Sequence, residues 1–379
     1  MKATVLLCGV LAASLAGADE TERLLAELTN AHGVSGFEGP VRDILRREWK
    51  DLLPDLHTDG LGNLIGSLPA HPENSDSPRV LLMAHMDEVG FLVRHIDEDG
   101  YLYINNVGGY FDQSVLTQRL SILTARGEVL GYTGMKSGHI LRPDERNRMI
   151  PLSDMFVDVG ATSRAEAEGM GLRAGLPVTY ATKFEVMNGT RRYLAKAFDD
   201  RVGLAVITEA LRRLRGGSHP NHLLVAATVQ EEIGLRGASV VSESTSPDIV
   251  INLEIGIASD FPLLTSKTLS QEELGTGAGI FVFDGSMIPN NNYIEWILRL
   301  ADENTIPVQL ESVTGYGEDA AMIQKSAKGV PAVNIGVPTR YGHSQSGVID
   351  RADYDHTVEL VVKMIERLTA QEVASLREF

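Results

Sequence analysis

The stretch Arg79-Val-Leu-Leu-Met-Ala-His85-Met-Asp87-Glu-Val-Gly90 decides how the rest of this chain is interpreted. Its apolar beginning predicts a buried strand over residues 79–84. Side chains repeat every two residues along a strand, so His85 and Asp87 should share one face at its end. Such a pair suits a metal site, in which the imidazole binds the ion and the carboxylate orients the ring. A purely structural histidine–aspartate pair fits the stretch equally well, so the remaining residues must decide.

The length and net charge of the chain limit the number of domains and the kinds of partner that it can have. It has 379 residues and a formal net charge of -17, enough length for about two domains with a sizeable core. The acidic balance argues against nucleic acid as a partner, because phosphate binding requires lysine and arginine. Beyond the N-terminus, we expect no membrane span, because no segment is long and apolar enough.

The N-terminal residues have the pattern of a secretory signal peptide. Lys2 is positively charged, residues 5–16 are apolar, and Ala16-Gly17-Ala18 fits the small-x-small cleavage rule. About a dozen apolar residues are too few for a membrane anchor, and the stretch lacks the polar face of an amphipathic helix. We expect residues 1–18 to be removed and the protein to be exported to a bacterial periplasm or exterior. Cys8, the one cysteine, would be lost with them, which excludes thiolate ligands and a cysteine nucleophile.

The remaining pattern predicts an α/β fold with an insertion. Helices are expected over 20–31, 39–53, 202–213, 293–303 and 354–374, and strands over 64–68, 79–84, 223–229, 249–253, 308–311 and 332–337. Their alternation predicts a mixed, mostly parallel sheet sandwiched by helices, formed by residues 19–90 and 185–379. Short alternating segments punctuated by glycines predict a small β-rich domain over 91–184, with a short helix over 164–169 that Thr162-Ser163 precedes and caps.

Further acidic or histidine clusters lie near the ends of these elements. Asp199-Asp200 leads into a helix, Glu231-Glu232 and Glu254 each follow a predicted strand, and His343 follows a later one. Ligands gather beyond the carboxyl ends of strands in an open α/β sheet, so the clusters should converge. Each has an ordinary alternative, such as a helix cap or a solvated loop. Adjacent carboxylates at the mouth of a buried strand, however, repel each other strongly unless cations offset their charge.

Together these residues favour a metal site over the structural alternative. Two histidines and three carboxylates can hold a pair of divalent ions roughly 3.5–4 Å apart, with one carboxylate bridging. Such a pair lowers the pKa of a water and polarises a carbonyl group. The glutamate left over beside a ligand glutamate is then well placed to be a general base. Nitrogen and oxygen ligands suit zinc, with cobalt or manganese as alternatives.

The chain resembles a known family, the tetrahedral aminopeptidases of metallopeptidase family 42, which include glutamyl and leucyl types. The resemblance covers nearly all of the mature chain, and its motifs occur in the family's order. They are Gly33-Val-Ser-Gly36, Asp59-Gly-Leu-Gly-Asn63, Ala84-His-Met-Asp-Glu-Val-Gly90, Ala197-Phe-Asp-Asp-Arg201, Gln230-Glu-Glu-Ile-Gly234 and Pro338-Thr-Arg-Tyr-Gly-His-Ser344. The family also carries an inserted β domain used for dimerisation and for assembly into dodecamers, so the resemblance implies a homo-oligomer.

The resemblance implies a role for each site residue. Two divalent ions would bind to two terminal histidines, a bridging aspartate and two terminal carboxylates, which are His85, His343, Asp199, Glu232 and Glu254. Glu231 would be the general base, and Asp87 would orient His85. The implied activity is removal of N-terminal residues from peptide substrates. The intact Glu231 and ligand set argue against the remaining alternative, a catalytically silent binding or assembly protein.

Three departures from the family pattern bear on this expectation. Glu254 stands where the family usually has aspartate, and glutamate at this place goes with some carboxypeptidases and deacylases of the wider superfamily. That substitution keeps a related amide hydrolase open as an alternative function. Gly317-Glu318-Asp319 stands where the family usually shows Gly-Thr-Asp, which bears on the substrate pocket. Most relatives are cytosolic, whereas this chain carries an export pattern.

Overall fold

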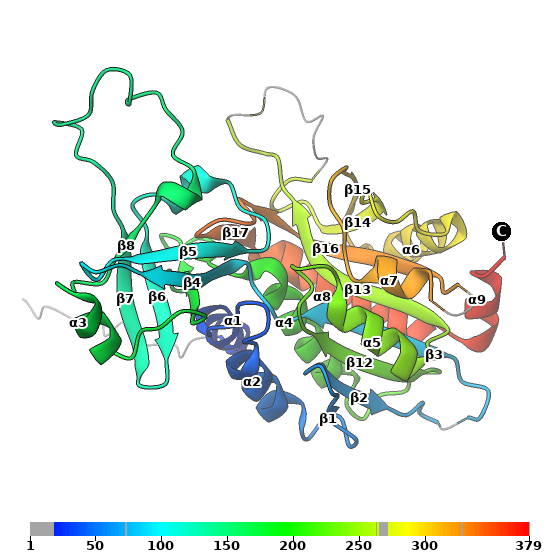
Figure 1. Cartoon of the computed structure of the whole chain (residues 1–379). Helices are drawn as coiled ribbons and strands as arrows, with labels where there is room; N and C mark the ends of the chain where they lie inside the picture. Colours follow the sequence, from blue (N-terminus) through cyan, green and yellow to red (C-terminus); the bar gives the residue numbers. More distant parts are fainter. Residues whose placement is uncertain (1–18, 73, 263, 265–271, 327–328, 379) are drawn as a thin grey trace, which may run out of the picture.

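The computed structural model of the protein describes residues 19–72, 74–262, 264, 272–326 and 329–378. The predicted signal peptide, residues 1–18, lies outside the described residues. A mixed sheet covered by helices forms the larger part, and a small closed β barrel forms the other (Figure 1). The predicted fold class, with its inserted β-rich domain, is confirmed. Within the described residues, no helix combines the length and apolar character needed to cross a membrane.

The large sheet has a parallel centre and antiparallel edges. Its strands within the described residues are β1 (His57–Thr58), β2 (Leu64–Leu68), β3 (Arg79–His85), β10 (Glu185–Val186), β11 (Arg192–Ala195), β12 (His222–Thr228), β13 (Ile249–Ile257), β14 (Ala278–Phe283), β15 (Val308–Ser312), β16 (Ala332–Arg340) and β17 (Gly347–Asp350). They follow the order β1-β2-β12-β3-β13-β16-β17-β11-β10, and β14 pairs with β15 and β16. The central strands β12, β3, β13 and β16 are parallel, so their carboxyl ends meet at one edge.

Helices cover both faces of this sheet. They are α1 (Glu20–Asn30), α2 (Gly39–Trp49), α4 (Phe198–Leu214), α5 (Arg236–Thr245), α6 (Asn291–Glu303), α7 (Ala320–Gln324), α8 (Arg351–Arg367) and α9 (Ala370–Ser375). The α4 helix packs on β3 and β13 and contacts α1 and α8, whereas α5 packs on β12 and α7 packs on β13 and β16. In Figure 1 the two groups lie on opposite sides of the sheet.

The β3 strand shows why this chain forms a sheet that is buried on both faces. Val80 and Leu82 join the core beneath α4, and Leu81 and Met83 join the core beneath α5 and α7. Successive side chains of a strand point to opposite faces, so an uninterrupted apolar run fills both cores. His85 ends the strand on the same face as Leu81 and Met83.

The inserted barrel has its own hydrophobic core. Its strands follow the order β4 (Gly90–Ile96), β5 (Leu102–Val107), β8 (Val157–Asp158), β7 (Gly127–Thr133), β6 (Arg119–Thr124) and β9 (Pro177–Tyr180). Phe91, Ile104, Leu120 and Val178 are among its buried core residues. The α3 helix (Arg164–Gly169) begins as predicted, because the Ser163 side chain accepts a hydrogen bond from the Glu166 N–H. The short helical turns η1 (Asp112–Val115) and η2 (Leu152–Asp154) complete this part.

A buried ionic network joins the barrel to the sheet beside the predicted site. The Glu88 carboxylate accepts hydrogen bonds from Lys196 at 2.8 Å, from Arg201 at 2.9 Å and from Thr179 of β9 at 2.8 Å. Although burial raises the pKa of Glu88, the two cations hold it at about 2. The network therefore fixes the segment that follows His85 and Asp87.

Several bounds of the predicted elements are wrong. The helix expected over 39–53 ends at Trp49, and the helix expected over 202–213 begins at Phe198. The predicted final helix over 354–374 is two helices, because α8 ends at Arg367 and the Thr369 side chain caps α9 by accepting from the Glu372 N–H. The strand predicted to end at Leu253 continues to Ile257, because β13 pairs with β16 from Val250 to Ile257. Glu254 therefore lies within a strand and not beyond its end.

Candidate metal centre

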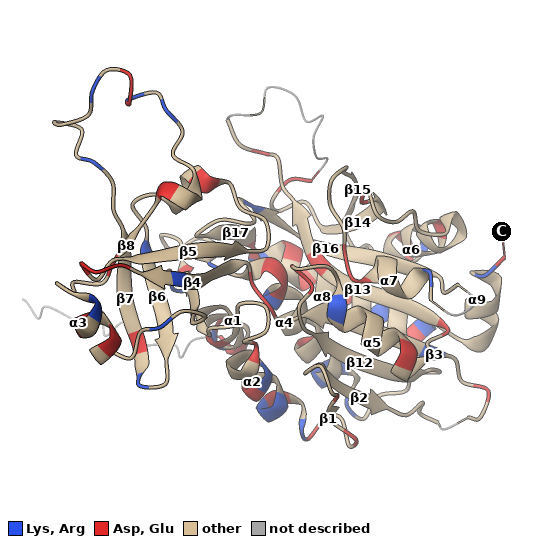
Figure 2. Ribbon diagram, in the orientation of Figure 1, with Lys and Arg blue, Asp and Glu red and all other residues tan. Residues whose placement is uncertain are grey.

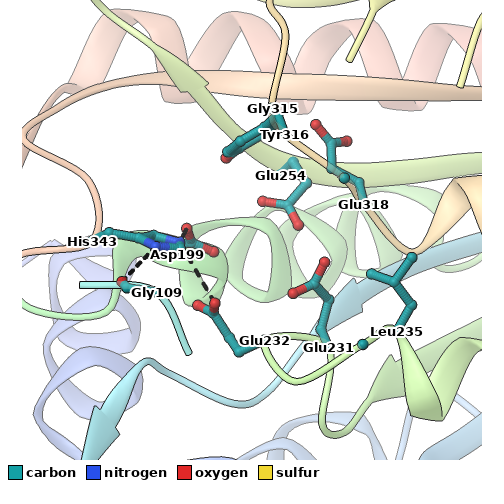
Figure 3. A pocket seen from close by; sticks show the side chains of 12 residues that line it. Gly109, Asp199, Glu231, Glu232, Leu235, Glu254, Gly315, Tyr316, Glu318 and His343 are labelled. Carbon is teal, nitrogen blue, oxygen red and sulfur yellow. Dashed lines mark hydrogen bonds and ion pairs between the residues drawn. The ribbon is translucent and has the colours of Figure 1, made fainter. Parts of the chain in front are cut away.

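The predicted site residues converge at the carboxyl edge of the central strands. His85 ends β3, Glu231 and Glu232 follow β12, Glu254 lies in β13, and His343 follows β16. Asp199 comes from the start of α4, which packs across β3 and β13. Figure 2 shows acidic segments around α4 and the neighbouring ends of β13 and β16. All of these side chains except His85 line a cavity of about 300 Å³, together with Gly109, Gly234, Leu235, Gly315, Tyr316, Gly317 and Glu318 (Figure 3).

Asp199 stands between the two histidines. One carboxylate oxygen, Oδ1, lies 2.9 Å from His85 Nε2, and the other, Oδ2, lies 3.1 Å from His343 Nε2. Each histidine also faces a second carboxylate, because Glu254 Oε1 is 3.4 Å from His85 Nε2 and Glu232 Oε2 is 3.5 Å from His343 Nε2. The five residues thus form two groups that share Asp199, one with His85 and Glu254 and the other with His343 and Glu232, and these groups are called the half-sites below.

The backbone fixes the tautomer of both histidines. Nδ1 of His85 donates to the backbone carbonyl of Asp87, and Nδ1 of His343 donates to the carbonyl of Gly109, both at 3.0 Å. A carbonyl oxygen can only accept, so each Nδ1 carries a hydrogen, and in the neutral form of each ring the lone pair would be on Nε2, facing the carboxylates. Histidine ligands of metals are oriented in this way.

The donor set fits a metal ion better than it fits a set of ordinary hydrogen bonds. The two Nε2 atoms each lie within 2.9 to 3.5 Å of two carboxylate oxygens, and the buried Oε1 of Glu232 has no hydrogen-bond partner. Burial and the charge of Asp199 raise the pKa of Glu232 to about 8. Burial lowers the pKa of His343, but Glu232 and Asp199 outweigh it and raise that pKa to about 10. Cations bound among these carboxylates would offset the repulsion between their negative charges.

The paired aspartates Asp199 and Asp200 play different parts in the structure. Asp200 accepts hydrogen bonds from the Gly203 N–H at 3.1 Å and from the His85 N–H at 3.3 Å. The helix-cap alternative therefore describes Asp200, which satisfies a backbone donor in the first turn of α4. Asp200 also lies close to His85 and Glu254. Asp199 alone of the pair points an oxygen at each histidine.

Asp87 supports more of the site than the sequence indicates. Its carbonyl holds His85, and its carboxylate accepts from the Glu231 N–H at 3.0 Å, the Glu232 N–H at 3.2 Å and the Ser35 hydroxyl at 2.6 Å. A single buried aspartate therefore positions one histidine and both adjacent glutamates. The Gly33-Val-Ser-Gly36 motif thus contributes to the site through the hydrogen bond from the Ser35 hydroxyl to Asp87.

Glu231 lines the cavity without facing either histidine nitrogen at ion-pair distance. It is 7% exposed, and Figure 3 shows its carboxylate beneath that of Glu254. Burial raises the pKa of Glu231 well above its usual value, and the carboxylates of Asp319, Glu254 and Glu232 add to this. A raised pKa suits a carboxylate that must accept and then release a proton.

Several residues of the site could not be found from local sequence signals. Gly109 reaches His343 from the inserted barrel, and Leu235 and Tyr316 form part of the cavity wall. The His343 side chain is 37% exposed, whereas that of Glu232 is 4% exposed. The cavity therefore opens on the side of His343, next to the barrel.

The comparisons with known proteins agree with this geometry. The profile described as M42 glutamyl aminopeptidase matches residues 62–360, and one described as AMPT matches residues 19–45. The lysyl aminopeptidase of Pyrococcus furiosus is 34% identical over 348 residues, which are 91% of this chain and 96% of that protein.

Solved structures give the same result. The TET aminopeptidase from Thaumarchaeota archaeon SCGC AB-539-E09 is 38% identical, with a TM-score of 0.90, and the match covers 94% of this chain and 100% of that one. The TET1 peptidase of Pyrococcus horikoshii, described as able to assemble into a tetrahedron or a large octahedral shell, is 28% identical, with a TM-score of 0.83. That match covers 92% of this chain and 100% of the other. The predicted type of enzyme, a metal-dependent aminopeptidase, is confirmed. The chain belongs to the M42 glutamyl aminopeptidase family.

Proposed function

We propose that this aminopeptidase works with two divalent metal ions, held at two half-sites that share Asp199. The observation that carries the proposal is the placement of the two Nε2 atoms, each opposite one oxygen of Asp199 at 2.9 and 3.1 Å. His85 and Glu254 would complete one half-site, and His343 and Glu232 the other. Imidazole and carboxylate ligands suit zinc, with cobalt or manganese as alternatives.

The protein's own groups would divide the work of peptide hydrolysis. Bound divalent ions lower the pKa of a water and polarise the scissile carbonyl. Glu231 would take a proton from the attacking water and deliver it to the leaving amine. Asp87 would hold Glu231 and Glu232 in place through their backbone N–H groups. The Glu254 carboxylate reaches His85 at 3.4 Å despite its longer stem, so glutamate at this position is compatible with a half-site.

A substrate panel combined with metal analysis tests this function. We expect p-nitroanilides of free amino acids to be hydrolysed and their N-acetylated counterparts to resist hydrolysis. The purified protein should contain about two metal ions per chain by mass spectrometry, and a chelator should remove both metal and activity. Release of acetate from the acetylated substrates, with no release of p-nitroaniline from the free amino acid substrates, would instead indicate a deacylase, the alternative that Glu254 keeps open.

We also propose that the protein is exported and assembles into oligomers. The charged start, apolar segment and Ala16-Gly17-Ala18 of residues 1–18 support export. The TET1 relative's assembly supports oligomerisation, as do the exposed apolar side chains of Phe111, Ile140 and Met149 in the inserted part. In Figure 1 the segment between β7 and β8 extends away from the barrel.

One purification tests both proposals. The full chain is expressed in a bacterial host, and the protein is isolated from the periplasm and the medium. We expect its N-terminal sequence to begin at Asp19 and light scattering to give a multiple of the dimer mass. A protein that retains Met1 and stays in the cytosol would contradict export, and a monomer would contradict assembly.

A further inference from the structure

Glu318 is a buried carboxylate without a partner in the wall of the catalytic cavity. It is 1% exposed, and neither of its oxygens has a hydrogen-bond partner. Among the described residues that line the cavity, none is a lysine or an arginine. A buried carboxylate is stable in its charged form only beside a partner of opposite charge, and the described residues of the cavity wall supply no lysine or arginine to Glu318. A cationic group that enters the cavity would supply that partner.

The candidate metal half-sites do not supply this partner. Glu318 is not among the five residues of the half-sites. Among the described residues, two groups have ligand atoms within 4.8 Å of one another, His85 with Asp199 and Glu232 and His85 with Asp200 and Glu254, and Glu318 belongs to neither. Figure 3 shows Glu318 on the side of Glu254 that faces away from Asp199 and His343. Burial, together with the charges of Glu254 and other carboxylates, raises the pKa of Glu318 well above its usual value. A cation beside Glu318 would relieve this repulsion.

The wall next to Glu318 suits a long, narrow side chain. Gly315 and Gly317 flank Tyr316 and add no side chains of their own. The Tyr316 hydroxyl donates to the Ile255 carbonyl at 3.3 Å, and its ring stacks on Phe281 with an interplanar angle of 3° and centroids 5.9 Å apart. An aromatic ring held in this way offers a flat surface to the methylene groups of lysine or arginine.

We propose that Glu318 binds the positively charged side chain of a lysine or arginine at the N-terminus of the substrate. This inference rests on the proposed function, because it places the scissile bond at the half-sites. The α-amine lies one carbon from the scissile carbonyl and must stay beside those half-sites. A lysine carries its ammonium on a flexible four-carbon stem, which extends past Glu254 towards Glu318. An N-terminal glutamate would meet like charge on this wall.

The test compares substrates that share a four-carbon side chain and differ in the terminal ammonium group of lysine. Lysine and norleucine p-nitroanilides are assayed with the wild-type protein, with Glu318→Gln, and with Glu318→Thr, the residue that the family usually has. We expect the wild-type ratio of kcat/KM, lysine over norleucine, to exceed one, and to fall by about 10-fold or more in both variants. Glu243→Gln, an exposed glutamate on α5, is the matched control and should keep the wild-type ratio.

Norleucine turnover separates failure of this proposal from failure of the proposed function. If the wild-type protein cleaves neither substrate, the aminopeptidase function itself is wrong. If the wild-type protein cleaves the norleucine substrate and both Glu318 variants keep the wild-type lysine-to-norleucine ratio of kcat/KM, Glu318 does not bind the substrate side chain. An equal fall for both substrates would assign Glu318 to the α-amine and overturn the proposal. A wild-type preference for the glutamate p-nitroanilide would also overturn it.

Discussion

Replacing Glu231 by glutamine is expected to lower kcat by about 10²–10⁴-fold while the metal content of the protein stays the same. Glutamine matches glutamate in size but cannot accept a proton at neutral pH. Glu231 lines the cavity, and the oxygens that face the histidine nitrogens belong to Asp199, Glu232 and Glu254. The substitution should therefore remove the general base and leave both half-sites intact. Steady-state kinetics and metal analysis by mass spectrometry measure the two effects separately.

The Glu243→Gln variant again serves as the control for a glutamate-to-glutamine change on the surface of α5. Two outcomes would contradict the role of Glu231. Wild-type kcat in Glu231→Gln would show that this carboxylate does not move the proton. Loss of metal from the variant would show that the Glu231 carboxylate is a metal ligand. Another carboxylate would then have to be the general base, and the hydrogen bond from the Glu231 N–H to Asp87 would serve to position a ligand.

The placement of His85 could be predicted because a strand's periodicity is local. The run from Val80 to Met83 fixes which residues face each core, and His85 follows the same alternation. The convergence of Glu231, Glu232 and Glu254 with His85 could also be anticipated, because parallel strands place their carboxyl ends at one edge. The sequence pattern therefore predicts which side chains meet, and the structure adds the distances between them.

Contacts between distant parts of the chain could not be predicted in this way. The bond from His343 to the Gly109 carbonyl joins residues 234 positions apart, and it depends on how the inserted barrel packs against the sheet. No periodicity in either segment encodes that packing. Asp87 is a second example. Its nearness to His85 in the sequence indicates that partner, but its hydrogen bonds to the Glu231 and Glu232 N–H groups could not be predicted. They depend on the turn after β12, where Gln230 has a φ of 55°.

The difference between Asp199 and Asp200 is the sharpest case, because adjacent identical residues give no local signal to separate them. A tight start to α4, with Ala197 at a φ of 54° and non-helical dihedrals at both aspartates, turns one carboxylate to the backbone and the other to the histidines. The metal-bridging role therefore depends on backbone geometry that composition and spacing do not reveal. A pair of matched substitutions can test it.

Asp199→Asn is expected to remove metal from the protein and to lower kcat/KM by about 10³-fold or more, because metal-ion catalysis supplies several kcal/mol of transition-state stabilisation. The amide keeps the shape of the side chain but loses the charge that both half-sites share. Its NH₂ group would also donate to one Nε2 and block that ligand position. Mass spectrometry of the purified variant should find fewer metal ions per chain than in the wild type.

Asp200→Asn is the matched control for this prediction. Asparagine can still accept the Gly203 N–H through its Oδ1, so the start of α4 should be retained. The variant loses the acceptor of the His85 N–H, but this 3.3 Å hydrogen bond is to the backbone, and its loss leaves the His85 ring and its Nδ1 bond unchanged. We expect this variant to keep its metal ions and to change the free energy of unfolding by about 1 kcal/mol or less. If Asp200→Asn lost metal and Asp199→Asn kept it, the assignment would have to be reversed. The group of His85, Asp200 and Glu254, whose ligand atoms also lie within 4.8 Å of one another, would then be the metal site, and Asp199 would be a hydrogen-bond partner of two histidines.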